Sequence, residues 1–395
     1  MNSADIAWML TATCLVFFMT PGLSFFYGGM VSKKNIISTM LQSFVALGVV
    51  SVWWVLIGFS LCFGESALGI IGNPMTFMGL SGVGIEAHES LSPNLPLILF
   101  AMFQLKFAVI TPALITGSFA ERINFKGYLF FILLFSTFIY APLCHMTWHP
   151  EGLLKLAGVL DYAGGTVVHM SAGIAALTGA MVLGRRLNRT EHQPVNIPFV
   201  LLGTGMLWFG WFGFNAGSSF SANGEAAMSF ATTNCASAAA MVTWVLIDLL
   251  RGRKVSAVGT CIGAVVGLVA ITPAAGFVTI SQSLIVGILG ACLSYAAIKL
   301  KNKTKLDDTL DVFPSHGIAG MFGMVATAFF AKDVGLIHGE TSTFIAHIMA
   351  LVGVFVFVFL VSIALYKTTN MLIPMRVNRE LEPYGLDQSQ HNEQY

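Results

Sequence analysis

The sequence predicts an all-α, polytopic membrane protein with eleven transmembrane helices, and three observations lead to this prediction. Hydrophobic residues make up 56% of the 395 residues and charged residues only 10%, whereas soluble domains carry roughly 25% charged residues. Apolar runs of about 18 residues or more recur along the chain, and each can cross a hydrocarbon core about 30 Å thick as a helix. Lys and Arg gather in every second connection between these runs. Reading the runs in order, we expect helices at 6–31, 39–63, 94–119, 127–148, 161–184, 197–220, 226–250, 256–274, 277–299, 313–331 and 342–373.

The placement of the basic residues predicts an orientation, because Lys and Arg of short connections stay on the cytoplasmic side. Seventeen of the twenty Lys and Arg obey one alternating pattern, and only Lys106, Lys155 and Lys332 lie elsewhere. We therefore expect a multi-pass protein of the cell membrane with its N-terminus outside and its C-terminus in the cytoplasm. The chain divides into a helical domain, 1–374, and a cytoplasmic tail, 375–395. The seventeen are Lys33, Lys34, Arg122, Lys126, Arg185, Arg186, Arg189, Arg251, Arg253, Lys254, Lys299, Lys301, Lys303, Lys305, Lys367, Arg376 and Arg379.

Several function classes are disfavoured. The net charge of +1 comes from residues that report topology, so we expect no nucleic-acid partner. The six cysteines are dispersed singly over the predicted helices, which indicates neither a disulfide framework nor a zinc site. We find no phosphate-binding loop and no nucleophile with a placed base. We therefore expect no enzyme activity, no catalytic residue, no metal site and no cofactor.

Two pairs of short segments indicate an internal repeat. Residues 110–113 and 271–274 both read Ile-Thr-Pro-Ala, and the segments 161–169 and 308–316 each begin with Asp and end with His. The predicted third helix thus corresponds to the eighth, and the fifth to the tenth. A unit of five helices gives these offsets, and an odd number of helices inverts the second copy in the membrane. We expect two inverted five-helix repeats plus one extra helix.

Ionisable residues within predicted spans are the first functional candidates, because they are costly to bury in a membrane. His169 and His316 occupy equivalent repeat positions, so a pseudo-two-fold axis would set two neutral imidazoles side by side at mid-membrane. The alternative is a pair of unrelated core histidines with satisfied hydrogen bonds. Asp161 stands before Gly164-Gly165-Thr166 and is interpreted either as a helix cap or as an anion that helps to hold a cation nearby.

Aromatic residues form the next layer of candidates. Phe103 and Phe107 are four residues apart on one predicted helix and share a face. Ring faces attract cations, by roughly 0.5–2 kcal/mol per contact. Core packing and interfacial belts are the ordinary use of membrane aromatics, and composition alone favours that alternative. The other candidates are Trp148, Trp211, Phe212 and Phe214.

Longer motifs give the chain a family resemblance. Asp161-Tyr-Ala-Gly-Gly-Thr-Val-Val-His169, Trp211-Phe-Gly-Phe-Asn-Ala-Gly-Ser218 and Asp311-Val-Phe-Pro-Ser-His316 lie in order on the expected helices. With Thr20-Pro-Gly22 near the start and Gly385-Leu-Asp387 in the tail, they make nearly the whole chain resemble the ammonium transporter, methylammonium permease and Rhesus family. The resemblance implies an eleven-helix homotrimer with a pore in each subunit that conducts ammonium or ammonia.

The resemblance also implies residue roles. It suggests an outer site where a cation meets ring faces and one hydroxyl, a stacked gate below that site, and paired histidines along a hydrophobic pore. Potassium resembles ammonium in size but donates no hydrogen bond and carries no removable proton, so such a pore would select chemically. The residues are Phe103, Trp148 and Ser218 for the outer site, Asp161 in support of it, Phe107 and Phe214 for the gate, and His169 and His316 for the pore.

Two further expectations concern partners and alternatives. The resemblance implies a PII-type trimeric signalling protein as a partner at the cytoplasmic face, beside the lipid bilayer and the substrate. The alternative function is an ammonium sensor that binds without conducting and signals to a cytoplasmic partner. Lys106 lies between two candidate pore phenylalanines. We expect it to snorkel or to pair with a carboxylate away from the pore, because a cation facing the vestibule would repel ammonium.

Overall fold

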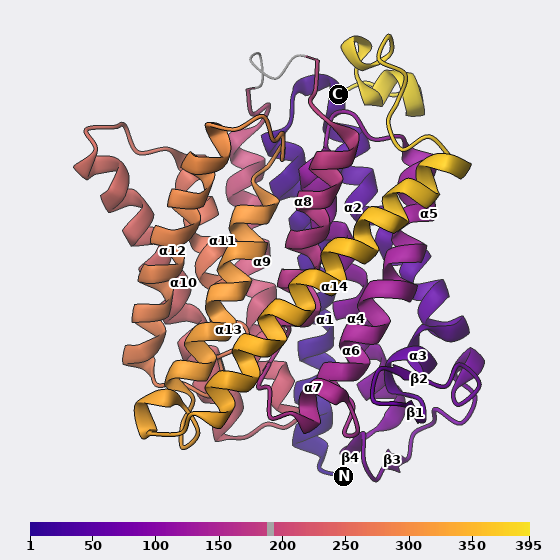
Figure 1. Ribbon diagram of the computed structural model, residues 1–395, viewed down its shortest axis with the longest axis vertical. Helices are drawn as coiled ribbons and strands as arrows, with labels where there is room; N and C mark the ends of the chain where they lie inside the picture. The colour runs from indigo at the N-terminus through magenta and orange to yellow at the C-terminus, as the bar shows by residue number, and fades with distance from the viewer. Residues whose placement is uncertain (188–192) are drawn as a thin grey trace.

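The computed structural model describes residues 1–187 and 193–395 and is a bundle of membrane-length helices (Figure 1). Within this part of the chain, ten helical segments are long and apolar enough to cross a membrane, and α11 is a shorter apolar helix. These eleven segments match the eleven predicted ones. Arg189, one of the residues used for the orientation, lies outside the described residues. The α-helices are α1 (Ser3–Met30), α2 (Ile36–Trp53), α3 (Phe59–Phe63), α4 (Leu97–Phe119), α5 (Phe125–Phe135), α6 (Ala141–Trp148), α7 (Leu153–Leu156), α8 (Ser171–Leu183), α9 (Ile197–Ala216), α10 (Gly224–Leu250), α11 (Ala257–Ile271), α12 (Ile280–Asn302), α13 (Ala319–Phe330) and α14 (Ser342–Leu372).

Several spans are built from an α-helix continued by a wider π-helical turn. The turn η2 joins α2 to α3, η4 joins α5 to α6, and η5 and η8 lead directly into α8 and α13. π-Turns are rare and are frequent at functional sites. Their bounds are Trp54–Gly58 for η2, Ser136–Tyr140 for η4, Gly165–Met170 for η5, Phe313–Ile318 for η8 and Asp387–His391 for η11. Shorter 3₁₀ turns are η1 (Lys33–Asn35), η3 (Met78–Leu80), η7 (Gly217–Ser219), η9 (Leu336–His338) and η10 (Glu382–Tyr384).

The packing follows the predicted repeat. The first helices of the two halves, α1 and α9, pack along each other, and α4 packs on α8 as α11 packs on α13. The contacts of the fifth helices are reciprocal, because α8 packs against η8 while α13 packs against η5. The remaining helix, α14, contacts α5, α8 and α13 and crosses the bundle obliquely (Figure 1). The fold is therefore two inverted five-helix units plus one helix, as predicted.

The two chain termini lie at opposite ends of the bundle (Figure 1), as an odd number of spans requires. At the N-terminal end, the long connection between α3 and α4 forms two antiparallel hairpins. In the first, β1 (Ser66–Ala67) pairs with β2 (Ile71–Gly72), with Ser66 opposite Gly72; in the second, β3 (Ala87–His88) pairs with β4 (Ser92–Pro96). The sequence predicts only a connection here, because strands of two residues show no alternation of apolar and polar side chains.

At the C-terminal end, buried ion pairs join the two halves. The Arg186 guanidinium contacts a carboxylate oxygen of Glu121 at 2.8 Å and one of Asp307 at 2.9 Å. Glu121 belongs to the first half and Asp307 to the second. Arg122 is fully buried and donates to the Thr309 hydroxyl at 2.7 Å and to the Asp307 carbonyl at 2.6 Å. These bonds fix the halves against each other at this end.

The tail after Pro374 packs against the C-terminal end of the bundle. The Asp387 carboxylate accepts hydrogen bonds from the backbone N–H of Ile37 at 3.0 Å and of Ser38 at 2.8 Å. Asn35, the N-cap residue of α2, makes no side-chain cap of its own, so the tail supplies the cap that the free N–H groups need. Gly385 lies at φ 90°, and a Cβ there would overlap the Lys34 carbonyl.

Candidate functional site

The start of η5 is fixed by a buried carboxylate. Asp161 precedes the helix and accepts hydrogen bonds from three consecutive backbone N–H groups and one hydroxyl. The donors are Gly164 N at 2.8 Å, Gly165 N at 2.6 Å, Thr166 N at 2.7 Å and Thr166 Oγ1 at 2.5 Å. The helix therefore begins at Gly165 rather than at residue 161, because Asp161 lies outside it as its cap. Among the described residues, the hydrogen bonds of the Asp161 carboxylate are thus helix-capping bonds, one of the two interpretations that the sequence leaves open.

Asp308 has the same arrangement in the second half. Its carboxylate accepts from Val312 N at 3.1 Å and Phe313 N at 2.8 Å, at the start of η8. Each carboxylate thus anchors the π-turn that carries one of the two histidines, His169 on η5 and His316 on η8. The equal spacing from aspartate to histidine in the two halves of the sequence reflects this shared arrangement of a capping carboxylate and a π-turn.

The two histidines meet in the middle of the bundle. The Nδ1 atoms of His169 and His316 are 3.4 Å apart, and the ring centroids are 5.5 Å apart. One Nδ1 must donate and the other accept, so the two neutral rings share one proton. The Trp211 ring stacks on His169 with centroids 5.4 Å apart. The buried Nε2 of His169 makes no hydrogen bond with any described residue. A small guest with a hydrogen-bond donor or acceptor has a free partner there.

Two stacked phenyl rings lie next to the histidines. The rings of Phe107 and Phe214 are 4.1 Å apart with an interplanar angle of 27°, and Phe214 lies 6.1 Å from the His169 ring. Both phenylalanines are fully buried. The predicted gate residues therefore stack on each other and separate the histidines from the N-terminal end.

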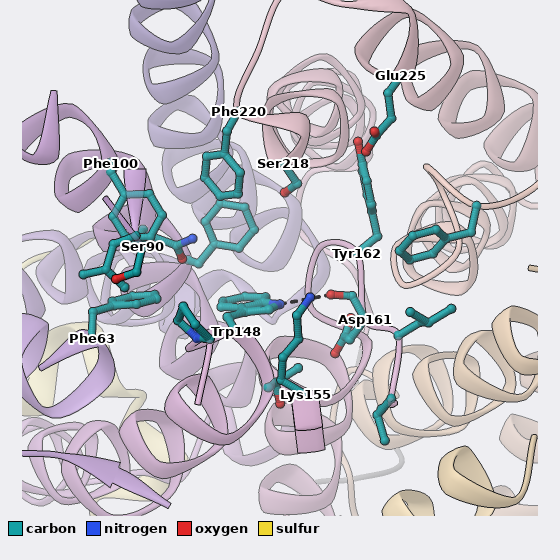
Figure 2. A pocket seen from close by; sticks show the side chains of 18 residues that line it. Phe63, Ser90, Phe100, Trp148, Lys155, Asp161, Tyr162, Ser218, Phe220 and Glu225 are labelled. Carbon is teal, nitrogen blue, oxygen red and sulfur yellow. Dashed lines mark hydrogen bonds between the residues drawn. The ribbon is translucent and has the colours of Figure 1, made fainter. Parts of the chain in front are cut away.

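On the other side of this ring stack, a cavity of about 250 Å³ opens toward the N-terminal end. Trp148, Asp161 and Ser218 line it, as Figure 2 shows. The Trp148 Nε1 donates to the Asp161 carbonyl at 3.0 Å, and the Ser218 hydroxyl donates to the Phe214 carbonyl at 2.9 Å. Because the Ser218 hydrogen is already used, its oxygen is left as an acceptor, which suits a donor such as an ammonium ion.

Phe103 lies behind this cavity rather than in its lining. Its side chain is 0% exposed and packs edge-on against Phe107, at 5.0 Å, and Phe220, at 5.7 Å. Phe220, Phe100 and Phe107 line the cavity. Phe103 therefore holds the rings that face the cavity.

Several polar residues of the lining were not among the predicted site residues. They come from α4, α6, α7, the start of α10 and the connections between helices, and Figure 2 labels Ser90, Lys155, Tyr162 and Glu225 around the cavity. Lys155 carried a signal, since it was one of three basic residues outside the topological pattern. The others carried none, because no sequence pattern indicates which polar residues of distant elements come to face one cavity. The set is Ser90, Gln104, Thr147, Lys155, Tyr162 and Glu225.

On the far side of the histidines, a second, very small cavity lies toward the C-terminal end. It measures about 10 Å³ and is lined by His316, Ser315 and Tyr27 together with apolar side chains. That volume holds at most about one water-sized molecule. The larger cavity, the ring stack, the paired histidines and the small cavity thus follow one another along one line of the protein.

Lys106 points away from this line. Its ammonium group lies over the Phe17 ring, 5.3 Å from the centroid, and it is not among the residues that line either cavity. Lys106 thus lies away from both cavities, as expected, but its contact is an aromatic ring of α1 rather than a carboxylate. Among the described residues, no group of three or more His, Cys, Asp or Glu side chains has the geometry to hold a metal ion.

Comparison with known proteins decides the family. The family model described as Ammonium Transporter Family matches residues 7–395. The chain belongs to the Ammonium Transporter Family. An ammonium transporter of Bacillus subtilis is 42% identical over 401 residues, with 100% of this chain and 98% of the relative covered. The family consists of membrane transporters rather than enzymes, in agreement with the sequence analysis.

Solved structures of other members of the Ammonium Transporter Family share the fold. The crystal structure of Saccharomyces cerevisiae Mep2 superimposes with a TM-score of 0.88 at 32% identity, covering 96% of this chain and 88% of Mep2. A protein described as "Sensor Amt Protein" superimposes with a TM-score of 0.90 at 28% identity, covering 98% of each chain. The fold of this chain thus occurs both in Mep2 and in a protein that is named as a sensor.

Proposed function

We propose that this protein conducts ammonium across a membrane through a pore in each subunit, taking up the cation at the N-terminal end. Phe107, Trp148 and Ser218 supply ring faces and an acceptor oxygen for the cation, and Phe103 holds the ring of Phe107 in place. Asp161 acts through η5, whose start it fixes. The observation that carries the proposal is the unpaired Nε2 of His169 directly behind the stacked rings.

The change from ammonium to ammonia follows from the burial of the residues that lie beyond the stacked rings. A bare cation is expensive among apolar side chains, whereas ammonia is neutral and hydrogen-bonds to the Nε2 of His169. Ammonium therefore gives a proton to water in the outer cavity at or before the ring stack, and ammonia passes between Phe107 and Phe214 and along His169 and His316. Return of the proton to the outer solution gives a pH change without current, whereas its passage along the paired imidazoles gives a current. Potassium carries no removable proton and is excluded.

The direct test measures current in vesicles that contain the purified protein. Ammonium pulses are expected to give a current or a pH change on a solid-supported membrane, and potassium pulses none. His169→Ala and His316→Ala each remove one polar wall of the pore and are expected to lower the ammonium response at least tenfold. Equal responses to ammonium and potassium in the wild type would disprove selective conduction.

A second candidate function is a sensor that binds ammonium without conducting it. The likeness to a structure named as a sensor favours keeping it. Such a protein would bind methylammonium in the outer cavity, seen as a change in Trp148 fluorescence, while vesicles show no flux. Flux at transporter rates excludes sensing as the sole role.

The orientation and assembly belong to the same proposal. The alternating basic residues assign the C-terminal end to the cytoplasm, so the outer cavity faces the outside of the cell membrane. We propose a homotrimer, tested by the mass of the particle in native mass spectrometry. We also propose that a PII-type protein docks on the cytoplasmic end. Deleting the tail after Pro374 tests its part in docking, and unchanged binding in a pull-down counts against it.

A further inference from the structure

Lys155 places a second ammonium group at the cavity that we propose for substrate uptake. It lies on α7 (Leu153–Leu156) and lines the cavity together with Trp148 and Asp161. Figure 2 shows its side chain extending toward these two residues. The sequence marks it as exceptional, since it lies outside the pattern that accounts for most basic residues of the chain.

The backbone around α7 fixes where this side chain starts. Gly152 lies so close to the end of α6 that a Cβ would overlap the carbonyls of His145 and Met146. The Leu153 N–H donates to the Gly69 carbonyl of the first hairpin turn at 2.8 Å. The short helix is therefore held between α6 and the hairpin, and Lys155 projects from a fixed position at the rim of the cavity.

The Lys155 ammonium group has no competing partner. Within residues 1–187 and 193–395 its Nζ forms neither an ion pair nor a hydrogen bond, and the side chain is exposed. The carboxylates of the cavity are engaged with other groups. Asp161 caps η5, and Glu225 lies beside the Tyr162 hydroxyl. The Lys155 charge therefore remains available to the cavity.

The Lys155 head group has the same chemistry as the substrate. Both present a positive nitrogen with several N–H donors, and the ring face of Trp148 with the acceptor oxygen of Ser218 suits either. A flexible four-carbon stem keeps the tethered group near the cavity at an effective concentration on the order of millimolar. A free ammonium ion therefore enters the cavity against the charge of this group.

We propose that Lys155 sets the affinity of the cavity by competing, as a tethered ammonium group, with the substrate cation. This inference rests on the proposed function, because it takes the cavity to be the site of ammonium uptake. Competition at the site of uptake raises the half-saturating ammonium concentration and leaves the maximal rate unchanged. Lys155 is thus a positioned competitor and takes no part in the passage beyond the rings.

The experiment compares Lys155→Gln with Lys332→Gln in full-length protein. Lys332 is exposed and follows α13 at the same end of the bundle, but it does not line the cavity, so its substitution removes the same charge elsewhere. Currents on a solid-supported membrane are recorded against ammonium concentration. Lys155→Gln is expected to lower the half-saturating concentration about fivefold, the scale of one nearby charge in a solvent-exposed site, with the maximal current unchanged. Lys332→Gln and the charge-preserving Lys155→Arg are expected to match the wild type.

Two outcomes overturn the inference while the proposed function stands. One is an equal half-saturating concentration in Lys155→Gln and Lys332→Gln. The other is a loss of maximal current in Lys155→Gln at an unchanged half-saturating concentration, which would make Lys155 part of conduction. If the wild type carries no current, tryptophan fluorescence titrated with methylammonium decides the question. Tighter binding by Lys155→Gln supports the competition, and unchanged binding or an absence of binding in both proteins overturns it.

Discussion

At the scale of single residues, the selectivity that we propose depends on the hydrogen-bonding atoms that His169 offers to a passing molecule. Its Nδ1 faces the Nδ1 of His316 at 3.4 Å, while its Nε2 is buried and free among the described residues. Two neutral rings give the pore polar atoms without a fixed charge. An ion gains little there, whereas a neutral hydrogen-bonding molecule gains a partner.

Replacing His169 by Asp is expected to admit potassium. A carboxylate in the pore carries the counter-charge that a bare cation lacks, so the cost of burying that cation falls. Potassium pulses on His169→Asp vesicles should then give a current that the wild type lacks. His347→Asn is the control, since His347 is buried but its Nε2 accepts from Leu160 N at 2.9 Å, outside the pore. An Asp variant that still conducts ammonium but carries no potassium current would contradict this account.

Asp307 makes the free energy of unfolding depend on pH at the acid end of the range. Burial by itself raises the pKa of this carboxyl, but the hydrogen bonds and charge of Arg186 outweigh it and lower the pKa to about 2. An unfolded Asp titrates near ~3.9, so the folded state binds fewer protons. The stabilisation is complete above pH ~4 and is lost as the pH falls toward ~2.

Asp307→Asn is expected to lower the free energy of unfolding by about 3 kcal/mol at pH 7, because it leaves the Arg186 charge buried with one partner fewer. Thermal unfolding in detergent between pH 2 and 7 measures this, and the variant should show a flatter acid limb. The exposed Asp333→Asn serves as the comparison. A wild-type-like acid limb in Asp307→Asn would assign the acid dependence to other groups.

Sequence alone predicted much at this scale and missed the rest for a physical reason. The histidines, Asp161 and the gate rings follow from the repeat and from the family motifs, both of which are local in sequence. The contact partner of Lys106, the ring of Phe17 rather than a carboxylate, does not, because it depends on how α1 packs against α4. The lining residues Lys155 and Glu225 were missed because their approach depends on how two distant connections pack.

At the scale of elements, the two π-turns behave as one device used twice. Each begins at a capping aspartate, Asp161 before η5 and Asp308 before η8, and each presents its histidine to the other. The reciprocal packing of α8 on η8 and α13 on η5 holds the pair together. The histidine geometry therefore depends on carboxylates that lie toward opposite ends of the bundle.

Removing either cap is expected to loosen only its own turn. Asp161→Asn replaces charge-assisted bonds to backbone N–H groups and should weaken the start of η5 by about 1–2 kcal/mol. Hydrogen–deuterium exchange followed by mass spectrometry should then be faster in peptides covering 162–171. Asp308→Asn is the matched control and should speed exchange in 310–319 instead. Equal exchange in both regions for both variants would show that the caps do not act locally.

The elements also show where sequence patterns stop being informative. The long apolar helices were predicted to within a few residues, because membrane-length apolar runs leave little choice. The hairpins β1–β2 and β3–β4 were not predicted. The helix expected at 161–184 begins at Gly165 in the structure. Both depend on hydrogen bonds between neighbouring segments rather than on hydrophobic length.

At the scale of the whole molecule, the tail closes the C-terminal end onto the bundle. Asp387 caps α2, Leu386 N donates to the Asn35 side chain at 2.8 Å, and Gln390 accepts from Phe125 N at 2.7 Å. The tail thus contacts both the connection between α1 and α2 and the start of α5. Binding of a partner to this end would have to cover or displace the tail.

Asp387→Ala is expected to release the tail without unfolding the bundle. Losing the cap of α2 costs about 1 kcal/mol, so the open tail should be populated about fivefold more and trypsin should cut at the exposed Arg379 correspondingly faster. Gln394→Ala, an exposed residue of the same tail, is the control. Unchanged cleavage of Asp387→Ala would mean that other contacts hold the tail.

The ring stack also bears on proton leakage across the membrane. Phe107 and Phe214 touch at a centroid separation of 4.1 Å, which leaves no width for a file of water between them. Protons hop along continuous water, so a resting subunit interrupts the path on which they would leak. In the proposed function, a membrane that holds many copies of this protein therefore keeps the voltage that drives ATP synthesis.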